Sequence, residues 1–365
     1  MTCLSVPGSP NTSAPPPSRR DRLVTSLAHR RIGQSELSVF PLALGAMNFG
    51  DPTPVEESFA ILSTAVAAGI DLIDVADVYN NGRAEEIVGE WIATSGVRDE
   101  LVIATKVGMA VGGVEAPQTH SRRHIEDSCD ASLRRLRTDR IDLYQLHKAS
   151  FDVPVADLVG VFDGLIDAGK IRSYGLSSHP ATMIREFVGV AGDARAAAPI
   201  SEQPPYNLLD RRIEREVVPA AVSCGVGLLA WSPLGGGLLA GRYAAGQAVP
   251  NGSRAQRKNA VRDRVTAAAI DAAAALDRLA VDTGLTSIQL SLAWVRDRPG
   301  VVAPIVGPRT VGQLHAMLSG LDVTLDDDVL AHIDLIVEPR TAVSDFYNTS
   351  GWSPGPLGTG GPALR

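Results

Sequence analysis

Four ionisable side chains stand at or just beyond the ends of three short apolar segments that have the composition of β-strands. They are Asp74, Tyr79, Lys106 and His147. Taken singly, each has an ordinary explanation as a capping, core or surface residue. Lysine and aspartate, however, do not end interior strands without partners. The set therefore predicts a shared site for proton transfer, without an activated nucleophile.

The chemistry of these side chains assigns each one a role. A tyrosine phenol has a pKa near ~10, and a neighbouring ammonium from Lys106 would stabilise its phenolate form and lower that pKa. Asp74 would pair with Lys106 and hold it in place. His147 would hydrogen-bond a carbonyl oxygen and align it beside the Tyr79 hydroxyl. Such a group gives a proton to a carbonyl oxygen or removes one, so the missing reactant is a hydride donor.

The surrounding sequence alternates short β-branched runs with longer segments of helical period, as in consecutive βα units. The predicted strands are 38–46, 72–76, 101–108, 141–147, 173–178, 199–203, 227–233 and 301–307. The predicted helices are 56–68, 84–94, 123–136, 155–168, 180–191, 211–224, 265–281, 286–297 and 310–319. Eight βα units in one series predict an α/β fold of the (β/α)8 TIM barrel type, whose strand ends converge on one mouth. No G-x-G-x-x-G turn follows the first strand, which disfavours a two-domain Rossmann enzyme.

Composition narrows the possible partners. The 365 residues are 45% hydrophobic and 21% charged, with a formal net charge of −7, so a long disordered or fibrous protein is excluded and no attraction to nucleic acid or an anionic membrane is expected.

Three cysteines without metal or disulfide spacing predict no metal site and a reducing compartment. No apolar run is long enough to cross a membrane. Arg19 and Arg20 lack the apolar segment of an export signal, so we expect a cytoplasmic protein.

The domain organisation follows from the two ends of the chain. Residues 1–26 are rich in Pro and Ser and are predicted to form a disordered leader. Residues 27–342 are predicted to form the barrel. Residues 343–365 are rich in Gly and Pro and are predicted to be an irregular tail, from which Phe346, Tyr347 and Trp352 could fold over the pocket.

Over about residues 30–325 the chain resembles the aldo-keto reductases, which are NADP(H)-dependent (β/α)8 oxidoreductases. The segments GIDLIDVADVY, VIATKVG and IDLYQLH match the family's catalytic tetrad at Asp74, Tyr79, Lys106 and His147. Further matches in order are LALGAMNFG, AEEIVGEWI, GKIRSYGLSS, EQPPYNLLDR, AWSPLGGGLLAGRY and PIVGPRTVGQL. The form of the last two is most similar to the bacterial and potassium-channel beta-subunit-like branch.

The resemblance implies NADPH as cofactor. Gln203 and Ser177 would hydrogen-bond the nicotinamide carboxamide, and Trp231 would stack on the nicotinamide ring. Arg309 would bind the adenosine 2′-phosphate, which a guanidinium can hold bidentately. The other cofactor-binding residues implied by the family are Met47, Asp74, Ser178, Ser232, Pro233, Leu234, Gly235, Gly236, Arg242, Arg254, Gly307 and Gln313.

The chain departs from the family pattern at four positions. Ser178 stands where the family usually has Asn, and Val75 stands where Thr or Ser is common. Val306 replaces a usual Pro, and Met317 replaces an Asn that commonly contacts adenine. The tetrad is untouched, so the departures concern nucleotide binding rather than the chemistry.

These observations favour a reductase that converts an aldehyde or ketone to an alcohol, with Tyr79 as general acid. Asn48, Phe49 and Tyr206, together with Tyr79 and His147, are expected to line the substrate pocket. Two alternatives remain: a biosynthetic reductase of a deoxysugar or other natural-product intermediate, and a non-catalytic regulatory subunit that senses NADP(H). The sequence names neither the small carbonyl substrate nor the oligomeric state.

Overall fold

The computed structural model describes residues 27–111, 118–257 and 262–347. The predicted leader 1–26 and the end of the tail, including Trp352, lie outside this range. Eight parallel strands close into a barrel, with β10 pairing with β3. They are β3 (Ala43–Gly45), β4 (Leu72–Asp74), β5 (Val102–Val107), β6 (Ile141–Leu146), β7 (Ile171–Ser177), β8 (Ser201–Gln203), β9 (Gly227–Trp231) and β10 (Val301–Val306). The predicted (β/α)8 barrel is confirmed.

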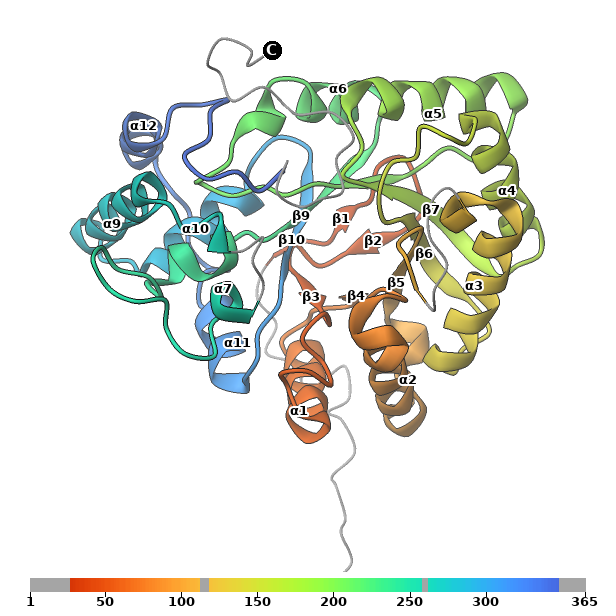
Figure 1. Cartoon of the computed structure of the whole chain (residues 1–365), viewed down its shortest axis with the longest axis horizontal. Helices are drawn as coiled ribbons and strands as arrows, with labels where there is room; N and C mark the ends of the chain where they lie inside the picture. Colours follow the sequence, from red (N-terminus) through yellow and green to blue (C-terminus); the bar gives the residue numbers. More distant parts are fainter. Residues whose placement is uncertain (1–26, 112–117, 258–261, 348–365) are drawn as a thin grey trace, which may run out of the picture.

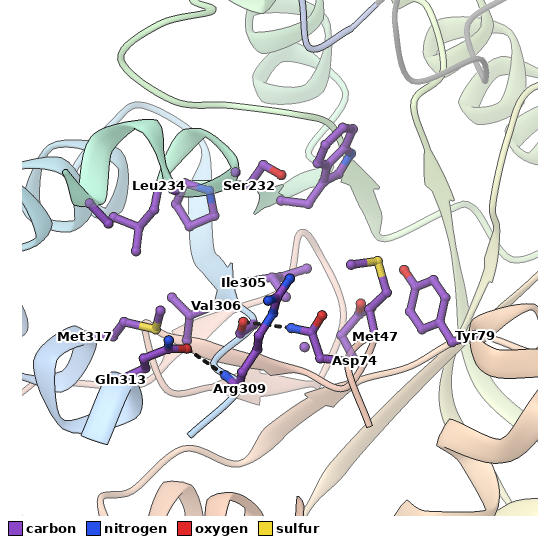
Figure 2. Close-up of a pocket in the computed structure, with 18 of the residues that line it drawn as sticks. Met47, Asp74, Tyr79, Ser232, Leu234, Ile305, Val306, Arg309, Gln313 and Met317 are labelled. Atoms are coloured by element: carbon purple, nitrogen blue, oxygen red, sulfur yellow. Dashed lines mark hydrogen bonds between the residues drawn. The ribbon is translucent and has the colours of Figure 1, made fainter. Parts of the chain in front are cut away.

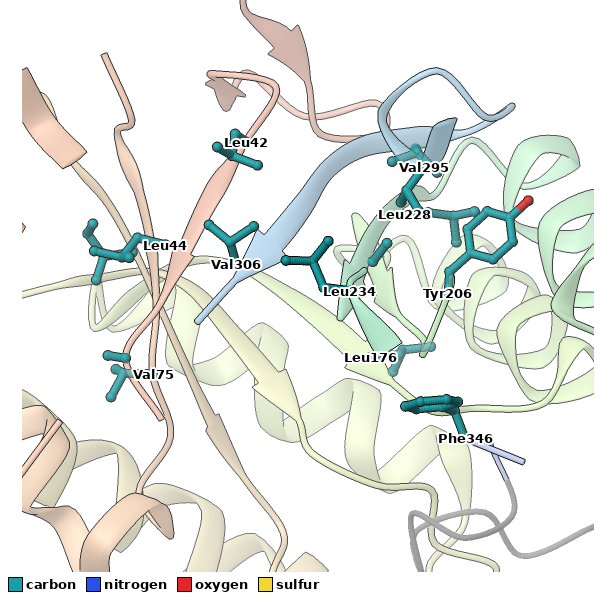
Figure 3. Close-up of a cluster of buried hydrophobic side chains, with 14 of the residues drawn as sticks. Leu42, Leu44, Val75, Leu176, Tyr206, Leu228, Leu234, Val295, Val306 and Phe346 are labelled. Carbon is teal, nitrogen blue, oxygen red and sulfur yellow. The ribbon is translucent and has the colours of Figure 1, made fainter. Parts of the chain in front are cut away.

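Helices surround the strands on all sides of the view in Figure 1. In chain order they are α1 (Val55–Ala67), α2 (Arg83–Ser95), α3 (Arg122–Leu136), α4 (Val155–Asp167), α5 (Ala181–Ala194), α6 (Val217–Ser223), α7 (Arg254–Arg257), α9 (Ala267–Asp282), α10 (Ser287–Arg296), α11 (Val311–Leu318) and α12 (Asp327–Ile336). Their apolar faces pack on the outside of the barrel, where the large core includes Leu44, Val75 and Leu176 (Figure 3). This packing buries both faces of each strand, as a parallel sheet requires.

A short antiparallel hairpin closes the barrel at the end opposite its mouth. Strands β1 (Arg30–Arg31) and β2 (Ser38–Val39) form it, and its side chains Ile32, Leu37 and Val39 join the interior core together with the lower residues of the barrel strands. Gly33 has a φ of 56°, and a Cβ there would lie 2.4 Å from the carbonyl oxygen of Ile200. Only glycine permits this approach, so the hairpin fits tightly beneath the barrel.

The fold differs from the sequence prediction in several places. The predicted strand 38–46 divides into β2 and β3, because Pro41 has no N–H to donate and the Phe40 N–H donates instead to Asp71 Oδ1 at 2.9 Å. The predicted helix 211–224 divides into a 3-10 turn (Arg212–Glu214) and α6, with Pro219 in the first turn of α6, where proline is tolerated. Helix α12 was not predicted.

The tail packs against the barrel before the described residues end. Residues 343–347 contain no helix or strand, yet Phe346 and Tyr347 are buried. The Asp210 carboxylate accepts hydrogen bonds from the backbone N–H groups of both, at 2.8 and 3.2 Å. Arg212 pairs with Asp210 and Asp345, each at 2.6 Å. The described residues after 342 are thus anchored to the loop that follows β8. The domain boundary at residue 342 stays a prediction.

Within the part of the chain that the structure describes, no helix combines the length and the apolar character that crossing a membrane demands.

Candidate active site

The four ionisable residues predicted from the sequence lie together at the carboxyl ends of neighbouring strands. Asp74 is the last residue of β4, Lys106 is the fifth residue of β5, and His147 follows β6 directly. Tyr79 begins a 3-10 turn, η2 (Tyr79–Gly82), in the loop after β4. The parallel register of the barrel brings these strand ends to one mouth.

Lys106 is the centre of this group. Its ammonium Nζ lies 2.6 Å from Asp74 Oδ2, 3.0 Å from the Val75 carbonyl oxygen and 3.3 Å from the Tyr79 hydroxyl. Lys106 is fully buried, and burial alone would lower its pKa, but Asp74 and Tyr79 outweigh that effect and raise it. Lys106 is therefore a stable ammonium beside a phenol, the arrangement that favours the phenolate.

A strained turn presents the Tyr79 hydroxyl to the ammonium. Asn80 and Asn81 have φ values of 50° and 53°, in the left-handed region where asparagine is tolerated better than most residues. The Asn80 side chain donates to the Phe49 carbonyl oxygen at 2.6 Å, which ties this turn to the loop after β3. The residues after Tyr79 thus explain how a side chain outside a strand is held so firmly at the mouth.

His147 stands edge-on to the Tyr79 ring. Their ring centroids are 5.7 Å apart with an interplanar angle of 80°. Burial, reinforced by the positive charges of Lys106 and Lys148, lowers the pKa of His147 well below its ordinary value. The imidazole is therefore neutral at pH 7 and has one N–H donor. A neutral donor next to the phenol can bind a carbonyl oxygen without competing for its proton.

A cavity of about 570 Å³ opens at the mouth beside Tyr79 and Asp74. Figure 2 shows Met47, Asp74 and Tyr79 at one end and Gln313 and Met317 at the other. Of the predicted site residues, the lining includes Met47, Asn48, Asp74, Tyr79, Gln203, Trp231, Ser232, Pro233, Leu234, Gly236, Arg242, Gly307, Arg309 and Gln313. Lys106 and His147 are not among the lining residues, and each contacts Tyr79. The cavity is thus elongated, with the proton-transfer group at one end.

Positive charge collects toward the other end. The Arg309 backbone N–H donates to Gln313 Oε1 at 2.8 Å, and its guanidinium Nη1 donates to the Gly252 carbonyl oxygen at 2.7 Å. Burial and the neighbouring charges of Arg242 and Arg257 lower the pKa of Arg309. Three cations held this close create a potential that an anionic ligand would relieve. The N-terminus of α11 begins just beyond, with Thr310 as its cap.

The segment after β9 has the backbone conformations expected of a close-fitting loop. Ser232 has a φ of 54°, and Gly235, Gly236 and Gly237 all have positive φ values. Trp231 ends β9 on the cavity wall. Gly235 itself is buried and lies off the cavity wall, and Arg254 begins the short helix α7. Glycine adopts positive φ values without strain, which explains the residue type at positions 235–237.

The carboxamide-binding residues expected from the family are joined by hydrogen bonds. Ser177 Oγ donates to the Gln203 carbonyl oxygen at 2.9 Å, and Gln203 Nε2 donates to Asp74 Oδ1 at 2.8 Å. Gln203 faces the cavity, whereas Ser177 and Ser178 are buried beside it. Ser178 has a φ of 57°, a conformation that suits asparagine better than serine, which gives a physical reason for the family's usual residue.

The residues predicted for the substrate pocket lie in different environments. Asn48 lines the cavity and its side chain donates to the Gly307 carbonyl oxygen at 2.9 Å. Phe49 is fully buried and is not among the residues that line the cavity. Tyr206 lies in the hydrophobic cluster outside the barrel (Figure 3), where its hydroxyl donates to Glu214 at 2.8 Å. The structure therefore places Phe49 and Tyr206 in packing positions rather than at the cavity.

One buried polar residue of the site was not singled out in the sequence. Gln145 lies in β6 with no exposed surface, and its Nε2 donates to Asp74 Oδ1 at 3.3 Å. The only signal was a buried-strand amide two positions before His147, in a strand that also contains Asp142. Among the departures from the family, Val75 accepts a hydrogen bond from Lys106 through its carbonyl oxygen, and Met317 lines the far end of the cavity.

Comparison with known proteins places this geometry in context. A model of the aldo/keto reductase family matches residues 41–338. An uncharacterized oxidoreductase, YrpG, of Bacillus subtilis is 34% identical over 87% of this chain and 98% of its own length. The protein tas of Escherichia coli is also 34% identical, over 86% and 99%. A probable voltage-gated potassium channel subunit beta of Arabidopsis thaliana is 32% identical over 88% of this chain and all of its own length.

Proposed function

This chain belongs to the aldo/keto reductase family of oxidoreductases, and we propose that it reduces an aldehyde or ketone to an alcohol with NADPH, using Tyr79 as the acid. The observation that carries the proposal is the 3.3 Å contact between the Tyr79 hydroxyl and the Lys106 ammonium, which Asp74 holds at 2.6 Å. This arrangement stands at the end of a cavity of about 570 Å³.

The residues present fit NADPH. The glycine-rich segment after Trp231, where Gly236 lines the cavity, would lie against a pyrophosphate, and Arg309 with its neighbouring arginines suits a 2′-phosphate. Gln203 and Ser177 suit the carboxamide. When bound, NADPH would supply the hydride that this chain has no group to provide. The preference for NADPH over NADH rests on Arg309, because a guanidinium binds a phosphate far better than a hydroxyl.

The chain's own residues would handle the carbonyl oxygen. Neutral His147 would donate its N–H to that oxygen and orient it toward Tyr79. As the carbonyl carbon gains hydride, Tyr79 would transfer its hydroxyl proton to the oxygen, giving an alcohol and a phenolate. The Lys106 ammonium would stabilise that phenolate, and a proton from solvent would restore the phenol before the next turnover.

The wider proposal concerns where and with what the protein acts. Residues 27–342 would form the catalytic unit, in the cytoplasm, with a small carbonyl compound as substrate and without nucleic acid or membrane as partner. The acidic net charge supports the absence of a nucleic-acid or anionic-membrane partner.

The decisive variant is Tyr79→Phe, which removes one hydroxyl. We expect turnover across a panel of neutral aldehydes, ketones and keto-sugar nucleotides to fall at least about 100-fold, the usual contribution of a general acid. NADPH affinity, measured by quenching of tryptophan fluorescence, should stay within about twofold of wild type. Tyr174→Phe is the matched control, because Tyr174 is fully buried against Phe162 in the helix layer, away from the cavity.

Two results would contradict the proposal. Full turnover by Tyr79→Phe would remove Tyr79 from the acid role. Tight NADPH binding by wild type with no turnover on any carbonyl would favour the regulatory-subunit alternative; the Arabidopsis thaliana relative is named a probable voltage-gated potassium channel subunit beta.

A further inference from the structure

Gln145 links the tetrad to the cofactor wall of the cavity. It lies beside Lys106 in the strand register, on the inner side of the barrel above the apolar layer that includes Leu143. Its amide makes two contacts: Nε2 lies 3.3 Å from Asp74 Oδ1, and Oε1 lies 3.2 Å from Gln203 Nε2. Gln145 has no exposed surface, so these hydrogen bonds compensate the burial of its amide.

The chain of contacts has a fixed polarity. The Asp74 carboxylate only accepts hydrogen bonds, so it requires the nitrogen, not the oxygen, of both neighbouring amides to face it. With its nitrogen toward Asp74, Gln145 must turn its oxygen toward Gln203. Both hydrogens of Gln203 Nε2 are then used, one by Asp74 Oδ1 at 2.8 Å and one by Gln145 Oε1. The Gln203 oxygen is the remaining polar atom of that side chain for a ligand in the cavity.

The barrel leaves room for this contact across a strand. Gln145 lies in β6 and Gln203 in β8, and the β7 residue in register with Gln145 is Gly175. A Cβ at Gly175 would lie 2.2 Å from Ser201 Oγ and 3.3 Å from Leu143 Cδ1. No side chain of β7 can therefore stand at this level between the two amides.

We propose that Gln145 is a positioning residue that fixes the orientation of the Gln203 amide, so that the cavity presents a hydrogen-bond acceptor to the amino group of the nicotinamide carboxamide. The inference rests on the proposed function, because it takes NADPH as the ligand. Gln145 itself does not line the cavity and acts through Gln203.

A nucleotide analogue that lacks the amino group separates this role from a merely structural one. In the reduced 3-acetylpyridine analogue of NADPH, a methyl group replaces the carboxamide amino group, so it cannot donate to Gln203. Replacing Gln145 by Leu or Met removes one of the two contacts that orient Gln203. We expect the Kd of NADPH to rise about fivefold, the value of one hydrogen bond between neutral groups, and the Kd of the analogue to change less than about twofold.

Both ligands are titrated by fluorescence quenching, so the readout does not depend on turnover. Thr105→Val is the matched control: it removes a buried hydrogen bond of 2.6 Å to Glu85 from the outer face of the neighbouring strand, and both Kd values should stay at wild type. Urea unfolding verifies that each variant is folded. If the Gln145→Leu variant does not fold, because leucine is branched, the Gln145→Met variant is titrated in its place.

The outcomes are distinct. Equal weakening of both ligands, or no change for either, would overturn the positioning role of Gln145 while leaving the proposed function standing. A wild-type protein that binds neither ligand would overturn the proposed function, and this inference with it. A loss confined to NADPH supports the role of Gln145.

Discussion

Replacing Arg309 by Met should abolish the preference for NADPH over NADH that we propose. Arg309 is partly buried, and the positive charges of Arg242 and Arg257 lower its pKa. A phosphate bound to the Arg309 guanidinium would relieve the repulsion among these three cations. The variant also loses the 2.7 Å hydrogen bond to the Gly252 carbonyl oxygen. That second loss affects both nucleotides equally, so the ratio of their affinities reports the phosphate contact alone.

The size of the effect follows from the kind of contact. A hydrogen bond to a charged group contributes about 1.5–3 kcal/mol. Because Arg309 is only partly shielded from solvent and two arginines remain nearby, we take about 2 kcal/mol. Since about 1.4 kcal/mol is tenfold in Kd, the NADPH Kd should rise roughly 30-fold relative to that of NADH.

Fluorescence titration with each nucleotide at constant salt measures both Kd values. Arg257→Met is the control, because it removes the same charge from a side chain that Asp51 already pairs at 2.6 Å, and it should alter the NADPH to NADH ratio less than about threefold. If Arg309→Met weakens both nucleotides by the same factor, Arg309 acts by anchoring the loop at Gly252 and the phosphate assignment is wrong.

Two further predictions concern stability. Burial raises the pKa of Glu202 from 4.5 to about 8, so the unfolded chain loses this proton first and wild-type stability falls as pH rises between those values. The unfolding free energy of Glu202→Gln relative to wild type should therefore rise by on the order of 3 kcal/mol from pH 5 to pH 8 in urea titrations; a flat difference would contradict it. Arg212→Met leaves Asp210 buried without its ion partner and should cost about 3–5 kcal/mol of unfolding free energy; wild-type stability and wild-type resistance to proteolysis near Asp345 would refute the anchoring role.

The barrel could be predicted because its signal is repeated. Each of the eight predicted strand segments overlaps an observed barrel strand, since β-branched runs and glycine-terminated helices recur along the chain. The hairpin β1–β2 escaped because its strands have two residues each, too short for any period. Helix α12 did carry a signal, with Asp326 as cap and Val329 and Ile333 as buried residues one turn apart, although it follows the last barrel strand.

The residues of the site also differ in how far the sequence could predict them. Asp74, Lys106 and His147 were predictable because strand ends determine where their side chains meet. Tyr206 was not, because its position depends on how the loop after β8 folds against α10, where its ring meets Trp294 at 5.2 Å. Gln145 was overlooked because the role of a single amide in a strand depends on its neighbours across the barrel, and the sequence does not identify them. Contacts between distant segments decide such residues, and a single sequence does not contain them.

The hairpin that closes the lower end of the barrel offers a handle for attaching the protein to a solid support. Glu36 is exposed at its turn, at the opposite end of the barrel from the cavity. A cysteine introduced there could be coupled to a bead or an electrode so that every molecule stands with its mouth toward the solution. Cys3 and Cys224 would be replaced first, so that only the introduced thiol couples; Cys129 is buried. In such an oriented layer, the support would not block the diffusion of ligands into the cavity.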